Sequence, residues 1–324
     1  MLLHLLFSMY KIKTGNEEYK EITDKYDIII GIEITYIRRT TMAVKVVTDS
    51  TSYIPQGLVE EYDISIASLN VILNGKSYKE VDLNNKEFYE DMEKSNEIPT
   101  SSQPSIDELF EIFKEKVVNG HDVVGIFLSS KMSGTYSSSH LVREMILEEY
   151  PDAKIELIDS TTNCMQMGYQ VLDAAKNAKL GNGINEVVKA AIQVKENSRF
   201  LFVPDTLKYL KKGGRIGGAS ALFGAILQIK PILTVENGET TVFNKVRTKK
   251  KAVDTIVNEV IKNVKEKGLG EVIVHHINCE DEGLELAKRL EEKLDIPVTI
   301  QYIGPIIGLH VGPGSIGIAY YTKG

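Results

Sequence analysis

A short strand-like segment followed by aspartate and hydroxyl residues occurs twice in this chain and constrains what it can fold into. Residues 44–47 precede the sequence TDST (48–51), and residues 155–158 precede DSTT (159–162). A looser copy, residues 200–203, precedes PDT (204–206). Aspartate, serine and threonine are good helix N-caps, so each copy alone is typical of an ordinary strand-to-helix turn. Together the copies predict an α/β fold with a mostly parallel sheet.

The segment 122–140, DVVGIFLSSKMSGTYSSSH, joins an apolar run to a loop rich in hydroxyl groups. Its apolar part, residues 123–128, is too short for a lone helix and rich in β-branched residues, which favours a strand buried on both faces. The hydroxyl residues that follow surround Gly134 and lead into a helix-like segment. Such a loop leaves hydroxyl oxygens and backbone N–H groups free to bind an anion. The segment therefore predicts a binding site.

A second hydroxyl cluster, TSSQPS (100–105), precedes a segment whose apolar residues have helical spacing, and Ser105 is placed to cap that helix. In a right-handed βαβ arrangement, the loops around Ser101 and Ser133 both lie near the carboxyl edge of the sheet. Open α/β sheets bind their ligands at that edge. Either loop alone is equally consistent with a polar capping loop. Two such loops at one edge favour a ligand site.

Turn signals and periodicity divide the chain into two α/β domains. An Asn-Gly hairpin is predicted at 68–78 in the first, and a second hairpin is predicted at 229–246. Helix, strand, helix and strand are expected at 251–266, 271–277, 280–293 and 297–302. We therefore expect an N-terminal Rossmann-like domain with a mostly parallel sheet over 43–198, and a C-terminal α/β domain with a mixed sheet over 199–324. Residues 1–42 share no pattern with the rest and are expected to be an extension, from a misread upstream start codon or a short amphipathic segment.

Composition excludes several classes of function. The net charge of -7 argues against nucleic acid as a partner, because a phosphate binder needs a basic surface. The two cysteines, Cys164 and Cys279, lie far apart, which favours a reducing compartment over a disulfide framework. No apolar run reaches about 18 residues, so no transmembrane helix is expected. We expect a cytoplasmic protein, for which transient contact with a membrane surface stays open.

The chain ends in a glycine-rich stretch, 303–321, that resembles a nucleotide motif only in spacing. Residues 312–317 match GxGxxG, but a strand-like IAYY follows, so no helix remains to receive a pyrophosphate. The glycines instead favour tight turns beside something bound. A metal site at His275, His276, Cys279 and Glu280 is disfavoured, because adjacent residues of a strand point to opposite faces.

Three further side chains near glycines have two interpretations each. His310 stands in an apolar context, where a lone histidine is usually a satisfied core residue, yet its ring could donate a hydrogen bond to a carboxylate. Arg215 and Arg247 are either solvated cations or contacts to an acidic ligand or partner. A hydrolase with Ser133 as nucleophile and His310 as base is the rival to a binding protein, although no GxSxG elbow is present.

These motifs together resemble one family. The resemblance is carried by VVTDSTSYIP (46–55), PTSSQPS (99–105), SSKMSGTYSSS (129–139), IDSTTNCMQMG (158–168), LKKGGRIGG (210–218) and GPIIGLHVGPGSIG (304–317). They are similar to the DegV family, bacterial fatty-acid-binding proteins that serve as the FakB subunit of fatty acid kinase in phospholipid metabolism. The similarity runs from about Val44 to the end of the chain.

The resemblance implies a lipid carrier without catalysis, cofactor or metal. One long-chain fatty acid, such as palmitate or oleate, would lie with its carboxyl group near the domain junction and its tail in an apolar tunnel. By motif, Ser101 stands where the family usually has threonine, Ser133 is the serine of the SGT element, and His310 precedes GPG. The implied binding set also includes Thr100, Gly134, Thr135 and Arg215. A separate ATP-dependent kinase subunit would form the acyl phosphate, and Arg215, Arg247 and residues 249–251 are candidates for docking it.

Overall fold

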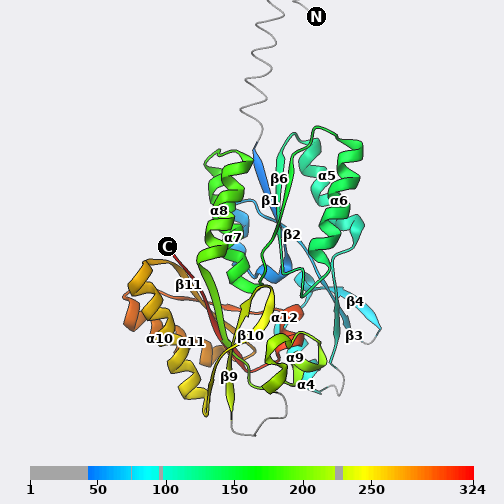
Figure 1. Ribbon diagram of the computed structural model, residues 1–324. Coiled ribbons are helices and arrows are strands. Elements are labelled where there is room, and N and C mark those ends of the chain that lie inside the picture. The colour runs from blue at the N-terminus through cyan, green and yellow to red at the C-terminus, as the bar shows by residue number, and fades with distance from the viewer. Residues whose placement is uncertain (1–42, 74, 95–97, 223–228) are drawn as a thin grey trace, which may run out of the picture. The chain divides into compact units, whose positions relative to one another are not determined.

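The computed structural model describes residues 43–73, 75–94, 98–222 and 229–324. The predicted N-terminal extension, residues 1–42, lies outside the described residues. The described strands form three sheets, and the elements are labelled in Figure 1. The mixed α/β architecture, with one parallel and one mixed sheet, confirms the predicted fold class.

The first sheet is fully parallel and has helices on both faces. Its strands are arranged in the order β2-β1-β6-β7. Helices α5 and α6 lie on one side of it, and α7 and α8 lie on the other (Figure 1). The elements are β1 (Val44–Asp49), β2 (Ser65–Ala67), β6 (Asp122–Phe127), β7 (Ile155–Asp159), α5 (Ile106–Val118), α6 (Thr135–Glu149), α7 (Cys164–Lys179) and α8 (Ile184–Asn197). We call residues 43–197 the parallel-sheet region.

Strand β6 shows why this sheet needs two helical layers. Val123 and Phe127 belong to the core under α5 and α6, whereas Val124 and Ile126 belong to the core on the other face. All four side chains are fully buried, as the apolar run 123–128 predicted. The side chains of β6 are therefore used for packing, and the polar residues that could contact a ligand lie in the loop that follows the strand.

A small antiparallel sheet follows β2 and supplies part of the later site. Its order is β4-β3-β5, with β3 (Asn70–Leu73), β4 (Lys76–Lys79) and β5 (Thr100–Ser102). The predicted hairpin at 68–78 is confirmed, and Gly75 has φ of 74°, a left-handed conformation that glycine adopts readily. Residues 100–102, expected to be loop, instead form a strand because they pair with β3. Ser105 caps α5 as predicted, accepting a hydrogen bond from the backbone N–H of Glu108.

The third sheet is mixed, with the order β10-β9-β8-β13-β11-β12 and only the β11-β12 pair parallel. It is built from β8 (Ser198–Val203), β9 (Lys230–Glu236), β10 (Glu239–Val246), β11 (Leu269–Ile277), β12 (Thr299–Tyr302) and β13 (Ser315–Thr322). We call residues 198–324 the mixed-sheet region. Helices α10 (Lys249–Lys267) and α11 (Glu280–Leu294) cover one face. The predicted hairpin at 229–246 and the helices and strands after it are confirmed.

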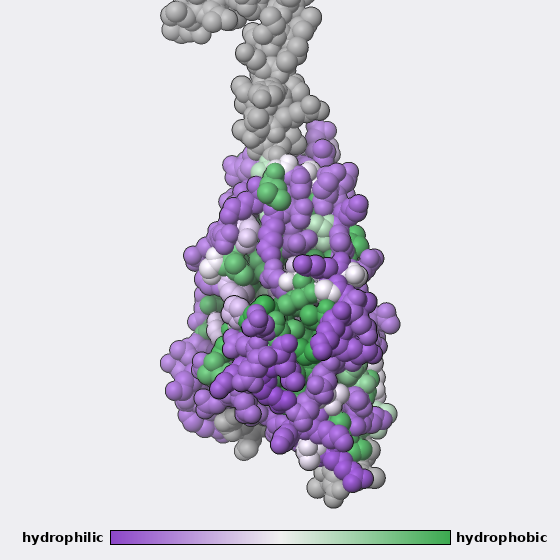
Figure 2. Space-filling model, turned by 90° about the vertical axis from the view of Figure 1, so that its left-hand side faces the viewer, coloured by the Kyte–Doolittle hydropathy of each residue, from purple (hydrophilic) through white to green (hydrophobic). Residues whose placement is uncertain are grey.

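The two faces of strand β8 serve different cores. Leu201 and Val203 pack under α10 and α11, whereas Phe200 and Phe202 belong to the core shared with the parallel-sheet region. This alternation is the period of two that a strand imposes. Figure 2 shows hydrophobic residues gathered in the middle of one side of the molecule, with hydrophilic residues above and below them.

Short helices complete the fold around this shared core. They are η1 (Ser50–Ser52), α3 (Gln56–Glu61), η2 (Glu80–Asp82), α4 (Asn85–Lys94), α9 (Lys208–Lys212), η3 (Gly217–Leu222) and α12 (Pro305–Val311). Helix α12, which carries His310, was not predicted from the sequence. Pro305 at its first turn and Gly312 after its last, with φ of 93°, are the signals that mark its ends. The expected strand after Gly314 is β13. No helix within the described residues is long and apolar enough to cross a membrane.

Candidate functional site

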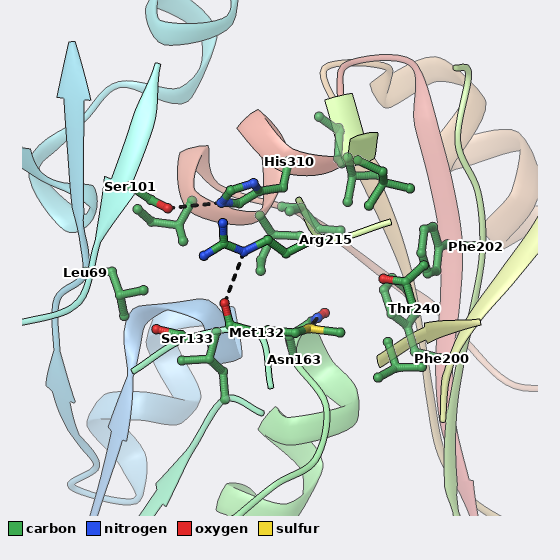
Figure 3. A pocket seen from close by; sticks show the side chains of 18 of the residues that line it. Leu69, Ser101, Met132, Ser133, Asn163, Phe200, Phe202, Arg215, Thr240 and His310 are labelled. Atoms are coloured by element: carbon green, nitrogen blue, oxygen red, sulfur yellow. Dashed lines mark hydrogen bonds between the residues drawn. The ribbon is translucent and has the colours of Figure 1, made fainter. Parts of the chain in front are cut away.

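A cavity of about 330 Å³ lies between the loops of the parallel-sheet region and the shared-core face of the mixed sheet (Figure 3). Ser101, Ser133, Arg215 and His310 lie on one side of it, whereas Thr240 lies among the phenylalanines on the other, and apolar side chains form most of the wall. The polar residues are Ser101, Ser102, Gln103, Ser133, Asn163, Arg215, Thr240, His310 and Ser315. The apolar residues include Leu69, Leu128, Met132, Phe200, Phe202, Leu210, Val235, Ile277, Ile303, Ile306, Ile307, Val311 and Ile316. Such a lining suits a ligand with one polar end.

Ser101 and His310 lie in contact in the wall of this cavity, although they are 209 positions apart in the chain. The distance from Ser101 Oγ to His310 Nε2 is 3.0 Å (Figure 3). Strand β5 supplies the serine and helix α12 supplies the histidine. Thr100, the neighbour of Ser101, is exposed and does not belong to the cavity wall. Of the predicted site residues, Ser101 and His310 therefore lie together in the cavity wall, and Thr100 lies outside it.

His310 is neutral at physiological pH. Burial, with a smaller contribution from the charge of Arg215, lowers its pKa from 6.5 to about 4. Its Nδ1 atom is buried and has no hydrogen-bond partner among the described residues. That nitrogen lies against Gly213, where any side chain would collide with it.

The environment of the ring assigns its proton to Nε2. A neutral imidazole holds one proton, and an N–H at Nδ1 would have no acceptor. With the proton on Nε2, the ring donates to Ser101 Oγ. The Ser101 hydroxyl then has its own hydrogen free to donate toward the cavity. The pair thus presents a hydrogen-bond donor suited to an anion.

Ser133 lies in the loop between β6 and α6. Its Oγ is 3.0 Å from Thr135 Oγ1 and accepts a hydrogen bond from the Thr135 backbone N–H. Gly134 also lines the cavity, and a side chain there would collide with Gln103. Thr135 is fully buried behind the loop and does not line the cavity. It therefore supports Ser133 and has no direct access to a ligand.

The two predicted arginines lie in different places. Arg215 lines the cavity and is exposed, and its Nε donates to the carbonyl of Met132 at 3.1 Å (Figure 3). It thereby joins the mixed-sheet region to the loop that carries Ser133. Arg247 follows β10, is exposed and does not line the cavity. Only Arg215 can contact a ligand inside the cavity.

The geometry does not assemble a hydrolytic triad. The partner of His310 is Ser101, whereas Ser133 bonds to Thr135. In a triad the second ring nitrogen is oriented by an acid, but Nδ1 of His310 has no partner within the described residues. A pKa near 4 also makes this ring a weak general base. The arrangement favours binding over acyl transfer.

His275, one of the two adjacent histidines, is already engaged in hydrogen bonds. Both ring nitrogens of His275 are occupied, because Nε2 accepts from the Met165 backbone N–H and Nδ1 bonds to the Gln301 carbonyl. Burial lowers the pKa of this ring to about 4. Across the described ranges, no three histidine, cysteine or acidic side chains group in a way that could hold a metal ion.

Comparison with known proteins identifies the family. A family profile described as "Uncharacterised protein, DegV family" matches residues 43–323. The chain belongs to the DegV family. A DegV domain-containing protein of Clostridium perfringens is 54% identical over 279 residues, covering 86% of this chain and 99% of its own. Protein DegV of Bacillus subtilis is 36% identical over 288 residues, covering 87% and 100%.

Solved structures of DegV proteins share the fold. DegV of Bacillus subtilis, described as a fatty acid binding protein, matches with a TM-score of 0.78 at 35% identity, covering 87% of this chain and 100% of its own. A protein of Eubacterium ventriosum, described as binding stearic acid, matches with a TM-score of 0.79 at 27% identity, covering 86% and 98%. The resemblance inferred from the sequence motifs is therefore confirmed at the level of the family.

Several wall residues of this DegV protein were not found by sequence reasoning. They are Leu69, Gln103, Asn163, Phe200, Phe202 and Thr240. Phe200 and Phe202 had one usable signal, because aromatic residues two apart in a strand share a face. Leu69 and Gln103 stand next to strand ends, Asn163 lies between β7 and α7, and Thr240 lies within the hairpin strand β10, and no local pattern marks any of them as facing a cavity.

Proposed function

We propose that this DegV protein binds one long-chain fatty acid, such as palmitate or oleate, and carries it without transforming it. The observation that supports this is a cavity that has the Ser101–His310 pair in its wall and is otherwise lined mostly by apolar side chains. Family members of similar structure are described as fatty acid binding proteins. A ligand with a carboxylate head and an apolar tail fits both parts of this wall.

The head group would be held by hydrogen bonds and oriented by charge. The hydroxyls of Ser101 and Ser133 would donate to the carboxylate, with His310 fixing the direction of the first. Arg215 supplies a positive charge at the cavity wall, which favours an acid over its ester. Gly134 lets the ligand approach the start of α6.

The tail would supply most of the affinity. Each buried methylene group contributes about 0.8 kcal/mol, so a chain of roughly a dozen outweighs the few hydrogen bonds at the head. Phe200, Phe202 and the isoleucines of α12 provide the apolar surface for it. The contacts to the carboxylate would therefore orient the ligand and distinguish an acid from its ester, and the contacts to the tail would supply most of the binding free energy.

We propose further that the bound acid is presented to a separate kinase subunit that forms the acyl phosphate with ATP. A carboxylate held by hydroxyls and a neutral ring keeps its oxygens available as nucleophiles toward a γ-phosphate. Arg247 is our candidate for docking the kinase, because it is exposed, lies outside the cavity and has no partner among the described residues. Arg247→Glu should lower coupling to the kinase and leave palmitate affinity unchanged, with Lys189→Glu on α8 as the control. Unchanged coupling would remove Arg247 from the interface.

Native mass spectrometry of the purified protein, followed by solvent extraction, tests the carrier function. We expect one fatty acid per chain, and the extract identifies its length. Delipidated protein should take up palmitate or oleate, and Ser133→Ala should weaken this about tenfold, as expected for one charged hydrogen bond. Ser137→Ala, on the exposed side of α6, is the control. A protein that takes up neither acid, or that hydrolyses acyl esters in a Ser133-dependent way, contradicts the proposal.

A further inference from the structure

A buried carboxyl group joins two walls of the cavity from outside it. Glu80, in η2, is only 5% exposed, and no ion pair to it is found among the described residues. An acidic side chain is almost never buried without a partner. Its two carboxyl oxygens instead accept hydrogen bonds from three residues in two segments of the chain, Ser50 and Tyr53 in the first and Ile306 in the second.

The first contact holds the start of α12. The backbone N–H of Ile306 donates to Glu80 Oε1 at 2.8 Å, across 226 positions in the chain. The hydroxyl of Tyr53 donates to the same oxygen at 2.8 Å and accepts from the backbone N–H of Ile307 at 3.1 Å. Ile306 and Ile307 both line the cavity, and the same helix carries His310. Glu80 therefore fixes the backbone beneath one wall.

The second contact holds the opposite wall. Glu80 donates its own backbone N–H to the carbonyl of Leu69 at 2.9 Å. Ser50 donates to Glu80 Oε2 at 2.5 Å, and its Oγ accepts from the Leu69 backbone N–H at 3.1 Å. Leu69 lines the cavity on the side of the small sheet (Figure 3). One residue thus ties Leu69 to the helix that faces it.

The surrounding chain is shaped to admit these contacts. A side chain at Gly304 would come within 2.7 Å of Glu80 Oε1 and 2.8 Å of the Tyr53 ring. Tyr53 itself has φ of 47°, an unusual left-handed conformation for an aromatic residue. Glycine at position 304 therefore leaves room for the carboxyl group of Glu80.

We propose that Glu80 is a positioning residue for the ligand cavity, and that through α12 and Leu69 it sets the affinity for the fatty acid. The inference rests on the proposed function. Glu80 does not line the cavity, so it acts through residues that do, such as Leu69 and Ile306. Its loss should let α12 shift against the small sheet and misplace His310 relative to Ser101.

The ionisation of Glu80 makes its positioning role dependent on pH, which can be measured. Burial raises its pKa from 4.5 to about 7. Above that pH the carboxylate accepts from Ile306, Tyr53 and Ser50 together, whereas below it one oxygen carries a proton and the contact with Ser50 must reverse. Its titratable neighbours are Asp49, whose pKa is raised to about 6, and Tyr53, Tyr89 and Cys164, whose pKa values burial raises well above their usual range. The three last groups stay neutral between pH 6 and 8.

Glutamine is the matched substitution, because it has the shape of the protonated acid and does not titrate. Palmitate dissociation constants are measured by calorimetry on delipidated protein at pH 6, 7 and 8, for wild type, Glu80→Gln and Asp82→Asn. Asp82 is an exposed acid of the same short helix and serves as the control. The titration of palmitate itself is common to all three proteins, so only differences between them are interpreted, and any change in the titration of Asp49 that follows the loss of the Glu80 charge counts as part of the effect of Glu80.

At pH 8 we expect Glu80→Gln to bind palmitate about tenfold more weakly than wild type, the loss of one charged hydrogen bond. At pH 6 the gap should shrink to less than about threefold, because wild type then carries a neutral carboxyl group too. Asp82→Asn should follow wild type throughout. A gap that is absent, or that is the same at every pH, overturns the proposal.

Two outcomes separate this inference from the function on which it rests. Wild type that binds no palmitate at any pH overturns both. Wild type that binds, with Glu80→Gln equal to it, overturns the positioning role alone. If Glu80→Gln does not fold, Tyr53→Phe replaces it, since it removes the hydroxyl between Glu80 and Ile307 and keeps the acid. Weaker binding by Tyr53→Phe supports the proposal, and unchanged affinity overturns it.

Discussion

Two helices, α7 and α12, contact both regions of this DegV protein and are mostly buried in the shared core, but α7 has 16 residues and α12 only seven. Helix α7 packs against β1 and β6 of the parallel sheet and against β8 and β13 of the mixed sheet. Nearly all of its first three turns are buried, through apolar residues such as Met167 and Leu172. Helix α12 packs against α4 and β3 on one side and α9 on the other, but polar groups fix its start.

The difference lies in how the two positions are specified. Apolar burial is strong but non-directional, so it stabilises α7 without fixing its position to a fraction of an ångström. Hydrogen bonds add less stability, but they are directional, and their lengths are restricted. Helix α12, which lines the cavity, buries fewer apolar residues than α7 and is held at its first turn by hydrogen bonds from Ile306 and Ile307 to side chains of the parallel-sheet region. We therefore expect changes in α7 to lower stability most and changes around α12 to lower ligand affinity most.

The largest effect on stability is expected for Leu172→Ala in α7. Leu172 is 1% exposed, so the substitution leaves a cavity in the shared core and should cost about 3 kcal/mol of unfolding free energy. Urea unfolding of delipidated protein measures it, since a bound ligand would add its own stabilisation. Leu180→Ala is the control, because Leu180 caps the same helix and is 79% exposed. If Leu172→Ala bound palmitate much more weakly than wild type and its unfolding free energy were unchanged, the comparison would be contradicted.

A smaller loss of stability with a larger loss of affinity is expected for Gly308→Ala in α12. A methyl group there would collide with the hydroxyl of Tyr89, which is buried and cannot move aside freely. We expect unfolding free energy to fall by about 2 kcal/mol, as in overpacked cores, and palmitate binding to weaken by more than about tenfold.

Gly57→Ala in α3 is the matched control for that substitution. A methyl group at Gly57 meets nothing within 4 Å, and alanine favours helix, so stability should rise by about 0.5 kcal/mol. Palmitate affinity that is equal in Gly308→Ala and Gly57→Ala would show that α12 does not set the cavity wall.

The same difference explains what the sequence could and could not predict. The strands around Val124 and Phe202 have continuous apolar runs, and such runs can be read locally. Helix α12 has only seven residues, so it is too short for a helical period to mark it. Glu80 stands in the polar sequence YKEVD, which is typical of a solvated turn, and its partner Ile306 is 226 positions away. The Ser101–His310 pair was reached only through family resemblance, because spacing carries no information on contacts of that range.

The smallest effect is expected for Tyr89→Phe, which removes a hydroxyl and leaves the ring. Tyr89 donates to the carbonyls of Ile303 and Gly304 at 2.9 and 3.0 Å, just before α12 begins. Its loss leaves a buried carbonyl with fewer partners and should cost about 1 kcal/mol of stability. Palmitate binding should weaken about threefold, because the start of α12 loses one anchor and keeps Glu80 and Tyr53.

The control for this last substitution is Tyr78→Phe on β4, where the ring is 40% exposed and should lose nothing measurable. Because Tyr89→Phe keeps the acid at Glu80, the change of its palmitate affinity between pH 6 and pH 8 should match that of wild type. A different pH response would mean that Tyr89 and Glu80 act as one unit, since the carboxyl group of Glu80 is the neighbour of Tyr89 that titrates near pH 7. In that case the polar anchors of α12 would be a coupled network, and their separate losses would not add.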